Sequence, residues 1–230
     1  MKRHSQKKTS FFNPIIIIGR QFASGGRHVG KIVADRLGID YYDTELLSEA
    51  AEKLGFSRHI FDIHDEKPPS QMRSLLQGVF GLADNFHDVS ICSERMYIEQ
   101  GKVIKEICEK GPCVIVGRTA DFIMRNHPGL VSIFLHAPLE KRAEIALRRG
   151  DAPNYTRALE LAKKYDRERE NYYNFYTGTQ SWGKANNYDL TIDSSVTGLH
   201  IAAELIIKLV ENKFKGRLRT YKRDALRQYF

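Results

Sequence analysis

The stretch Ile15-Ile16-Ile17-Ile18-Gly19-Arg20-Gln21-Phe22-Ala23-Ser24-Gly25-Gly26-Arg27 decides the fold of this chain. Its four consecutive isoleucines do not alternate with polar residues, so they predict a strand buried on both faces, as in the middle of a parallel sheet. The chain then bends through small residues and enters a helical pattern from about Gly26 to Leu37. A buried strand, a glycine-rich turn and a helix N-terminus together form an anion site, because backbone N–H groups and the helix dipole favour negative charge. The expected occupant is a nucleotide phosphate.

The turn departs from the strict phosphate-binding pattern G-x-x-x-x-G-K-[ST]. If Gly26-Arg27-His28 is its end, Gln21 occupies the first glycine position, Arg27 replaces the lysine and His28 replaces the magnesium-binding hydroxyl. Ser24 is the nearest hydroxyl that could substitute, so it is the predicted metal ligand. The alternative is a tight strand-to-helix turn that binds no ligand. On the phosphate-binding interpretation, the donor phosphates contact Gly19, Ala23, Ser24, Gly25, Gly26, Arg27 and His28.

Composition bounds the class of protein. The 230 residues are enough for one sizeable core, and 42% hydrophobic with 28% charged residues is ordinary for a soluble globular protein. No apolar run approaches the roughly 20 residues of a membrane span, and the basic N-terminus does not read as a secretory signal. The three cysteines are an odd number without C-x-x-C spacing, which favours reduced thiols in a cytoplasmic protein.

The net charge of +8 suits an anionic partner, and much of the excess sits at the two ends. We interpret residues 1–12 and 215–230 as basic, solvated tails, so a nucleic-acid partner is not expected. Residues 13–214 form the predicted single domain.

Apolar runs alternate with helical patterns in that domain, which predicts a parallel sheet with helices on both faces. The predicted strands are Ile15–Ile18, Ile39–Tyr42, Cys113–Val116, Leu130–Leu135 and Leu190–Ile192. The predicted helices after the first are Thr44–Leu54, Ser93–Glu109, Pro138–Arg149, Tyr155–Phe175 and Val196–Phe214. Two segments interrupt the rhythm, at about 57–89 and 148–184, and insertions of this size often form mobile lobes over a site.

Polar side chains follow the predicted strands at the edge where ligands bind in such folds. Asp43 ends the second strand and is interpreted either as an N-cap or as a ligand-binding residue. Arg118 follows the third strand and suits a phosphate, because its planar fork binds two oxygens; the alternative is a surface pair with Asp121. Asp193 has the position of an N-cap, and Trp182 is interpreted as local packing rather than a base-stacking residue.

The predicted helix 155–175 is dense in cations, mostly interspersed with acids as on a solvated surface. Arg167 and Arg169 cannot share one narrow stripe of a helix, so only a subset of the cations faces any site. One or two of them could close over a phosphate and stabilise a transferring phosphoryl group.

With these residues in place, the chain resembles the cytidylate kinase-like family, a branch of the nucleoside monophosphate kinases with the P-loop NTPase fold. The resemblance runs from about Ile15 to Val210. The motifs that carry it are the glycine-rich stretch Gly19–Arg27, Tyr41-Tyr42-Asp43, Asp65-Glu66-Lys67-Pro68-Pro69-Ser70, Gly111-Pro112-Cys113-Val114-Ile115-Val116-Gly117-Arg118, His136-Ala137-Pro138-Leu139-Glu140-Lys141-Arg142, and Trp182-Gly183 followed by Asn187-Tyr188-Asp189-Leu190 and Asp193-Ser194-Ser195.

The resemblance implies a three-layer α/β sandwich with five parallel strands in the order 2-3-1-4-5. It also implies phosphoryl transfer from ATP, with Mg²⁺, to a nucleoside monophosphate such as CMP or dCMP. Segment 57–89 would be the acceptor-binding lobe and 148–184 a helical lid. Asp43, Arg118 and Asp121 would bind the acceptor, and Arg27, Arg118 and Arg167 or Arg169 would be the catalytic cations. Val116 stands where authentic cytidylate kinases carry an aspartate, and Ala23 replaces a more usual glycine.

Three other functions remain open from the residues. The altered turn fits a nucleotide-binding sensor without efficient chemistry. A kinase for another small acceptor, such as a sugar, would share the same motifs. The basic ends would fit a nucleic-acid-binding protein, whose affinity should fall steeply with salt.

Overall fold

The computed structural model describes residues 13–56 and 86–215 of the chain. The predicted N-terminal tail 1–12, most of the predicted lobe 57–89 and all but the first residue of the tail 215–230 lie outside the described residues. Residues 86–89, which the sequence placed in the lobe, belong to the first turns of helix α5 (Phe86–Lys110).

Five parallel strands form the central sheet. They are β1 (Ile15–Arg20), β2 (Asp40–Tyr42), β3 (Cys113–Val116), β4 (Leu130–His136) and β5 (Leu190–Asp193). Their order is β2-β3-β1-β4-β5, which confirms the predicted order. Ile15 lies between Cys113 of β3 and Leu130 of β4, so the isoleucine strand is the central one.

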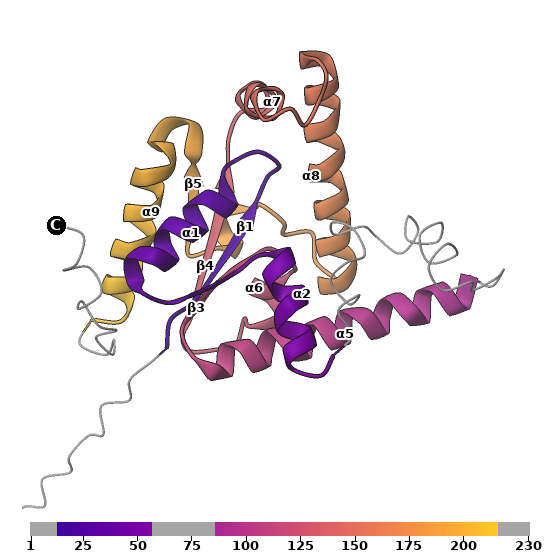
Figure 1. Cartoon of the computed structure of the whole chain (residues 1–230), viewed down its shortest axis with the longest axis vertical. Coiled ribbons are helices and arrows are strands. Elements are labelled where there is room, and N and C mark those ends of the chain that lie inside the picture. The colour runs from indigo at the N-terminus through magenta and orange to yellow at the C-terminus, as the bar shows by residue number, and fades with distance from the viewer. Residues whose placement is uncertain (1–12, 57–85, 216–230) are drawn as a thin grey trace, which may run out of the picture.

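The isoleucines of β1 build two cores, one on each face of the sheet. Ile16 and Ile18 pack with α1 (Gly26–Leu37) and α9 (Ser194–Lys213). Ile15 and Ile17 pack with α2 (Thr44–Lys53) and α5. Side chains of a strand alternate between faces, so an uninterrupted apolar run is what a sheet covered on both sides requires. Figure 1 shows these helix pairs on opposite sides of the strands.

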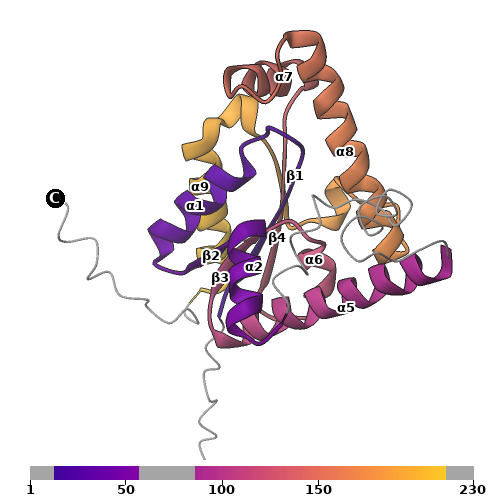
Figure 2. The ribbon, with the colours of Figure 1, turned by 45° about the vertical axis from the view of Figure 1, so that its right-hand side comes forward.

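Two further helices lie beyond the carboxyl ends of β1 and β4. α7 (Leu139–Arg148) packs against α8 (Tyr155–Thr177), and Figure 2 shows the two side by side. Alanines fill the space between these helices and the glycine-rich turn: Ala23, Ala143, Ala146, Ala152 and Ala158 form one buried cluster. The small residues allow α7 and α8 to approach the turn closely.

The sequence missed some local structure. Ile39 was predicted in a strand, but it belongs to the cap of α1: Gly38 has φ 64°, and the N–H of Ile39 donates to the carbonyl of Ala34. α5 begins at Phe86 rather than Ser93. The short helix α6 (Ala120–Ile123) and the 3₁₀ turn η1 (Ala185–Asn187) were not predicted. None of the helices in the described parts of the chain combines the length and hydrophobicity of a membrane span.

Candidate functional site

The turn between β1 and α1 presents backbone N–H groups at a helix start that no side chain caps. Gly25 is the N-cap residue, with φ 87° and no side-chain hydrogen bond to the first turn. An added Cβ there would overlap Cδ2 of Leu199, and one at Gly26 would lie 2.9 Å from Cβ of Arg20. Ala23 also has a positive φ, of 59°, which alanine adopts at a cost. The first N–H groups of a helix lack intrahelical acceptors, so this turn offers its amides to an anion.

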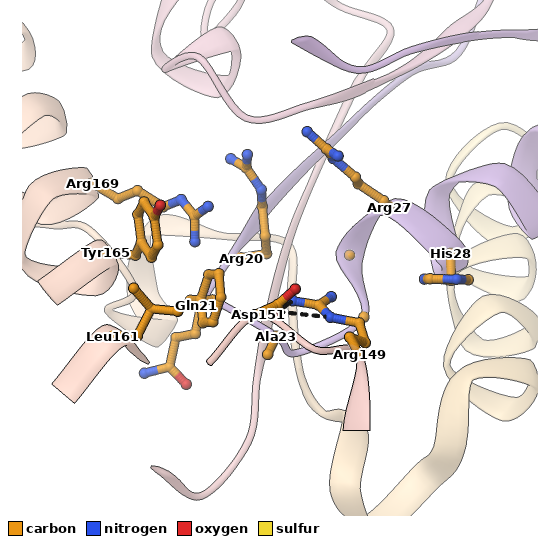
Figure 3. A pocket seen from close by; sticks show the side chains of 13 residues that line it. Arg20, Gln21, Ala23, Arg27, His28, Arg149, Asp151, Leu161, Tyr165 and Arg169 are labelled. Carbon is orange, nitrogen blue, oxygen red and sulfur yellow. Dashed lines mark hydrogen bonds and ion pairs between the residues drawn. The ribbon is translucent and has the colours of Figure 1, made fainter. Parts of the chain in front are cut away.

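A cavity of about 490 Å³ opens beside the turn. One wall is the turn itself, from Arg20 to His28 without Ser24, and the facing wall comes from α8 and the connection before it. Figure 3 shows the side chains of Arg20, Arg27, Arg149 and Arg169 around the cavity.

Positive charge dominates the cavity. Four arginines line it, against one carboxylate, Asp151, which already accepts a hydrogen bond from Nε of Arg149 at 2.9 Å. Arg169 is 8% exposed, although its side chain lines the cavity. Its guanidinium carbon lies 6.0 Å from the ring centre of Tyr165. Arginine forks and open amides around a concave site suit a polyphosphate.

Arg27, at the position of the usual lysine, reaches the cavity from the first turn of α1. Its side chain is 52% exposed, and Nη1 lies 4.0 Å from Oε1 of Glu45 in α2. An exposed pair at this distance is weak, so Glu45 leaves Arg27 available to an anion. His28 lines the same cavity and is exposed.

The two arginines predicted on α8 differ in their position relative to the cavity. Arg169 lines the cavity, whereas Arg167 is exposed and does not line it. The structure therefore brings Arg169, and not Arg167, to the glycine-rich turn.

Ser24 does not face the cavity. Its side chain is 1% exposed, and its hydroxyl lies 2.9 Å from the carbonyl oxygen of Gln21 and 3.1 Å from that of Leu135. Because both contacts are to acceptors, the hydroxyl hydrogen is directed to the backbone. The described residues contain no group of three or more His, Cys, Asp or Glu side chains that could hold a metal ion. Among the described residues, side chains alone therefore do not form a magnesium site. The Ser24 hydroxyl supports the shape of the turn, and its role as a metal ligand stays a prediction.

A second, smaller pocket of about 20 Å³ adjoins the cavity and shares Arg20 and Arg169 with it. Gly19, Arg118 and Asp121, all predicted at the site, line this pocket. Arg118 is 2% exposed and has φ 62°, so a strained backbone holds its side chain inward.

Aromatic rings enclose the far side of this pocket. The hydroxyl of Tyr173 donates to Oδ2 of Asp121 at 2.8 Å, and burial, together with the Asp121 charge, raises the pKa of Tyr173. The ring of Trp182 packs edge-on against Phe134, with centres 5.2 Å apart, which agrees with the packing interpretation. The ring of Phe134 leaves little room at two glycines, because a Cβ at Gly19 or Gly183 would lie 3.0 Å from it.

Asp43 and Asp193 both cap helices. Oδ1 of Asp43 accepts the N–H groups of Glu45 and Leu46, each at 3.2 Å, and Asp43 lines neither pocket. The side chain of Asp193 accepts the N–H of Ser195 at 2.9 Å. The N-cap interpretation accounts for both residues, and a ligand-binding role for Asp43 stays a prediction.

Sequence reasoning missed part of the cavity wall, namely Arg20, Phe22, Arg149 and Tyr165. Arg20 carried a signal, because it ends β1 at the edge where ligands bind. Phe22 lies in the turn, but no local pattern marked it, and Arg149 and Tyr165 come from segments far from the turn in the chain.

Comparison with known proteins shows the family and the fold. The cytidylate kinase-like family matches residues 15–196. No match is found among curated proteins. A solved structure of an uncharacterized protein from Eubacterium ventriosum ATCC 27560 has 27% sequence identity and a TM-score of 0.64, over 86% of this chain and 98% of that one.

Two more distant structures share the fold. A shikimate kinase from Bacteroides thetaiotaomicron has 11% identity and a TM-score of 0.50, over 87% of this chain and 98% of its own. The protein TT1252 from Thermus thermophilus has 17% identity and a TM-score of 0.52, over 89% and 99%. The chain thus shares its fold, a five-stranded parallel sheet between helices, with these two structures.

Proposed function

The chain belongs to the cytidylate kinase-like family, and we propose that it transfers a phosphoryl group from ATP to a nucleoside monophosphate, with CMP or dCMP as the acceptor. One observation carries the proposal: the open amides of the glycine-rich turn and four arginines surround one cavity. Family membership supports phosphoryl transfer from a nucleotide, and the acceptor is our own extension.

The arrangement supports a division of labour. The turn amides and Arg27 bind the donor phosphates, while Arg169 and Arg149 face them from the opposite wall. Arg118 binds the acceptor phosphate in the adjoining pocket, and Arg20 and Arg169 lie between the two pockets. An acceptor oxygen attacks the terminal phosphorus, and the bond from that phosphorus to the bridging oxygen of ADP breaks. The arginines stabilise the charge on the transferring group, which is the main task in this chemistry.

ATP is the proposed phosphoryl donor, and we expect it to bind together with Mg²⁺. The hydroxyl of Ser24 is directed to backbone carbonyls, and Asp151 is paired with Arg149. The buried free thiols of Cys108 and Cys113 support a cytoplasmic location.

A substrate panel tests the proposal. The full-length protein is incubated with ATP, magnesium and each nucleoside monophosphate in turn, and ADP and nucleoside diphosphate are measured. We expect turnover with CMP or dCMP, abolished by Arg118→Gln and retained by the exposed Arg167→Gln. Absence of turnover with every monophosphate, in a folded sample that binds ATP, would refute the proposal.

The replaced lysine and hydroxyl favour one alternative, a nucleotide-binding sensor. It predicts ATP binding in a calorimeter without product from any acceptor. A kinase for a different small acceptor is the remaining alternative, because most of the predicted acceptor-binding segment 57–89 lies outside the described residues. Adding sugars and other hydroxyl acceptors to the panel distinguishes it.

A further inference from the structure

The backbone of Phe22, in the middle of the glycine-rich turn, forms hydrogen bonds with two distant segments through its N–H and its carbonyl group. Its N–H donates to Oδ1 of Asp166 in α8 at 2.7 Å. Its carbonyl accepts a hydrogen bond from Nη1 of Arg142 in α7 at 3.2 Å. These partners lie more than a hundred residues further along the chain, so the contacts are tertiary and specific.

The two partners also bind each other. Nη1 of Arg142 lies 2.7 Å from Oδ2 of Asp166, and their side chains are only 5% and 15% exposed. Nε of Arg142 donates to the carbonyl of Ala137, which follows β4, at 2.9 Å. Each carboxylate oxygen of Asp166 thus has its own donor, and the pair joins the turn, α7 and α8 at one buried point.

The side chain of Phe22 is held by the same helix. Its ring stacks on Tyr165, with centres 4.8 Å apart and planes at 17°. Tyr165 and Arg169 are four residues apart on α8 and therefore lie on one face of the helix. Both line the cavity, so the contact with Phe22 sets where Arg169 stands relative to the turn.

We propose that Arg142 and Asp166 are positioning residues of the phosphate site. They hold the Phe22 peptide, and through it they fix the spacing between the turn amides and the Arg169 guanidinium. The inference rests on the proposed function only in taking a polyphosphate as the occupant. It also bears on the predicted lid, because the pair joins the middle of α8 to the turn.

Variants of Arg142 and Asp166 distinguish an effect on phosphate binding from an effect on the stability of the fold. Arg142→Met and Asp166→Leu each leave one buried charge without its partner, so each variant should lower the unfolding temperature. The double variant contains neither charge, so much of that loss should be recovered. Each single variant keeps only one of the two hydrogen bonds to the Phe22 backbone, and the double variant keeps neither. The double variant should therefore bind inorganic tripolyphosphate at least about tenfold more weakly than the parent, with the single variants weakened too, by calorimetry on the full chain. A purely structural role predicts that affinity recovers with stability in the double variant.

Two more variants keep the test decisive. Asp166→Asn preserves volume and an acceptor for the Phe22 N–H but cannot pair with Arg142, so it should weaken binding by about threefold. Glu160→Gln breaks the exposed ion pair with Arg157 on the same helix and should bind tripolyphosphate as the parent does.

The proposal is overturned if the folded double variant binds tripolyphosphate within about twofold of the parent. If the double variant does not fold, parental affinity in Asp166→Asn overturns it. A parent that binds tripolyphosphate but phosphorylates no acceptor refutes only the kinase function. A parent that does not bind tripolyphosphate refutes both.

Discussion

Replacing Gly25 with alanine tests whether the shape of the turn creates the phosphate site. The residue has φ 87°, and a Cβ would overlap Cδ2 of Leu199. The left-handed conformation costs alanine about 1–2 kcal/mol. Crowding against Leu199 adds about 1–3 kcal/mol, because part of the turn or the leucine must move. The free energy of unfolding should therefore fall by about 2–5 kcal/mol, which lowers Tm by about 4–20 °C in a domain of this size.

Gly38→Ala is the matched control, because it isolates the backbone cost. Gly38 caps the other end of α1 with φ 64°, but a Cβ there would meet nothing within 4 Å. It should lose only about 1–2 kcal/mol. In a Leu199→Ala background, Gly25→Ala should lose a similarly small amount, because the crowding is gone.

Thermal unfolding and ATP calorimetry are the two assays. Gly25→Ala should weaken ATP binding by about tenfold or more, since the amides at the start of α1 shift, while Gly38→Ala should bind ATP as the parent does. Equal losses of Tm in the two variants would refute the crowding argument. Unchanged ATP affinity in Gly25→Ala would refute the role of the turn geometry.

Three other predictions test the site and its caps. Arg169→Gln should lower kcat/KM for phosphoryl transfer by about 10²–10³ and Arg167→Gln by less than about twofold; equal effects would contradict the assignment of Arg169 to the cavity. Ser24→Ala removes a hydroxyl bonded to the backbone and should lower the free energy of unfolding by about 1–3 kcal/mol. The magnesium concentration for half-maximal activity should not change, and a shift would instead identify Ser24 as a metal ligand. Hydrogen bonds from the hydroxyl and N–H of Ser195 lower the pKa of Asp193. The stabilisation from Asp193 is therefore present above the unfolded-state pKa, about 4, and lost as pH falls through the lower folded value. Asp193→Asn should keep the cap at neutral pH and show a shallower fall of Tm in acid; parallel curves for the two proteins would contradict this cause.

Local signals predicted most of the fold. The uninterrupted isoleucines of β1 predicted a central strand. The predicted bounds of α1 agree with the observed ones, and glycines lie at both of its ends. The start of α6 carried no such signal: Arg118 and Thr119 adopt φ values of 62° and 51°, a conformation that neither residue type favours. Residue preferences for backbone conformation do not predict a turn that is built from non-glycine residues with positive φ.

The site was predictable where one segment makes it. The turn residues that line the cavity lie in one continuous segment, from Arg20 to His28. The prediction that Arg167 and Arg169 would not both face the site followed from helix geometry. The wall formed by Phe22 and Tyr165 was not predictable, because the two stacked rings come from segments 143 residues apart in the chain. The buried pair of Arg142 and Asp166 was not predictable for the same reason, because in the sequence the two residues look like ordinary charged residues of a protein surface.

The ring of Phe134 links positions that are remote in the chain. It packs on Gly19 near the end of β1 and on Gly183 before η1, and a methyl group at either would lie only 3.0 Å from the ring. A larger residue at Gly19 would thus favour a slimmer side chain at 134, and that slimmer side chain would in turn release Trp182. Gly183 has φ 71°, so it should stay glycine whatever stands at 134. In natural relatives of this chain, positions 19, 134 and 182 should accordingly vary together rather than singly.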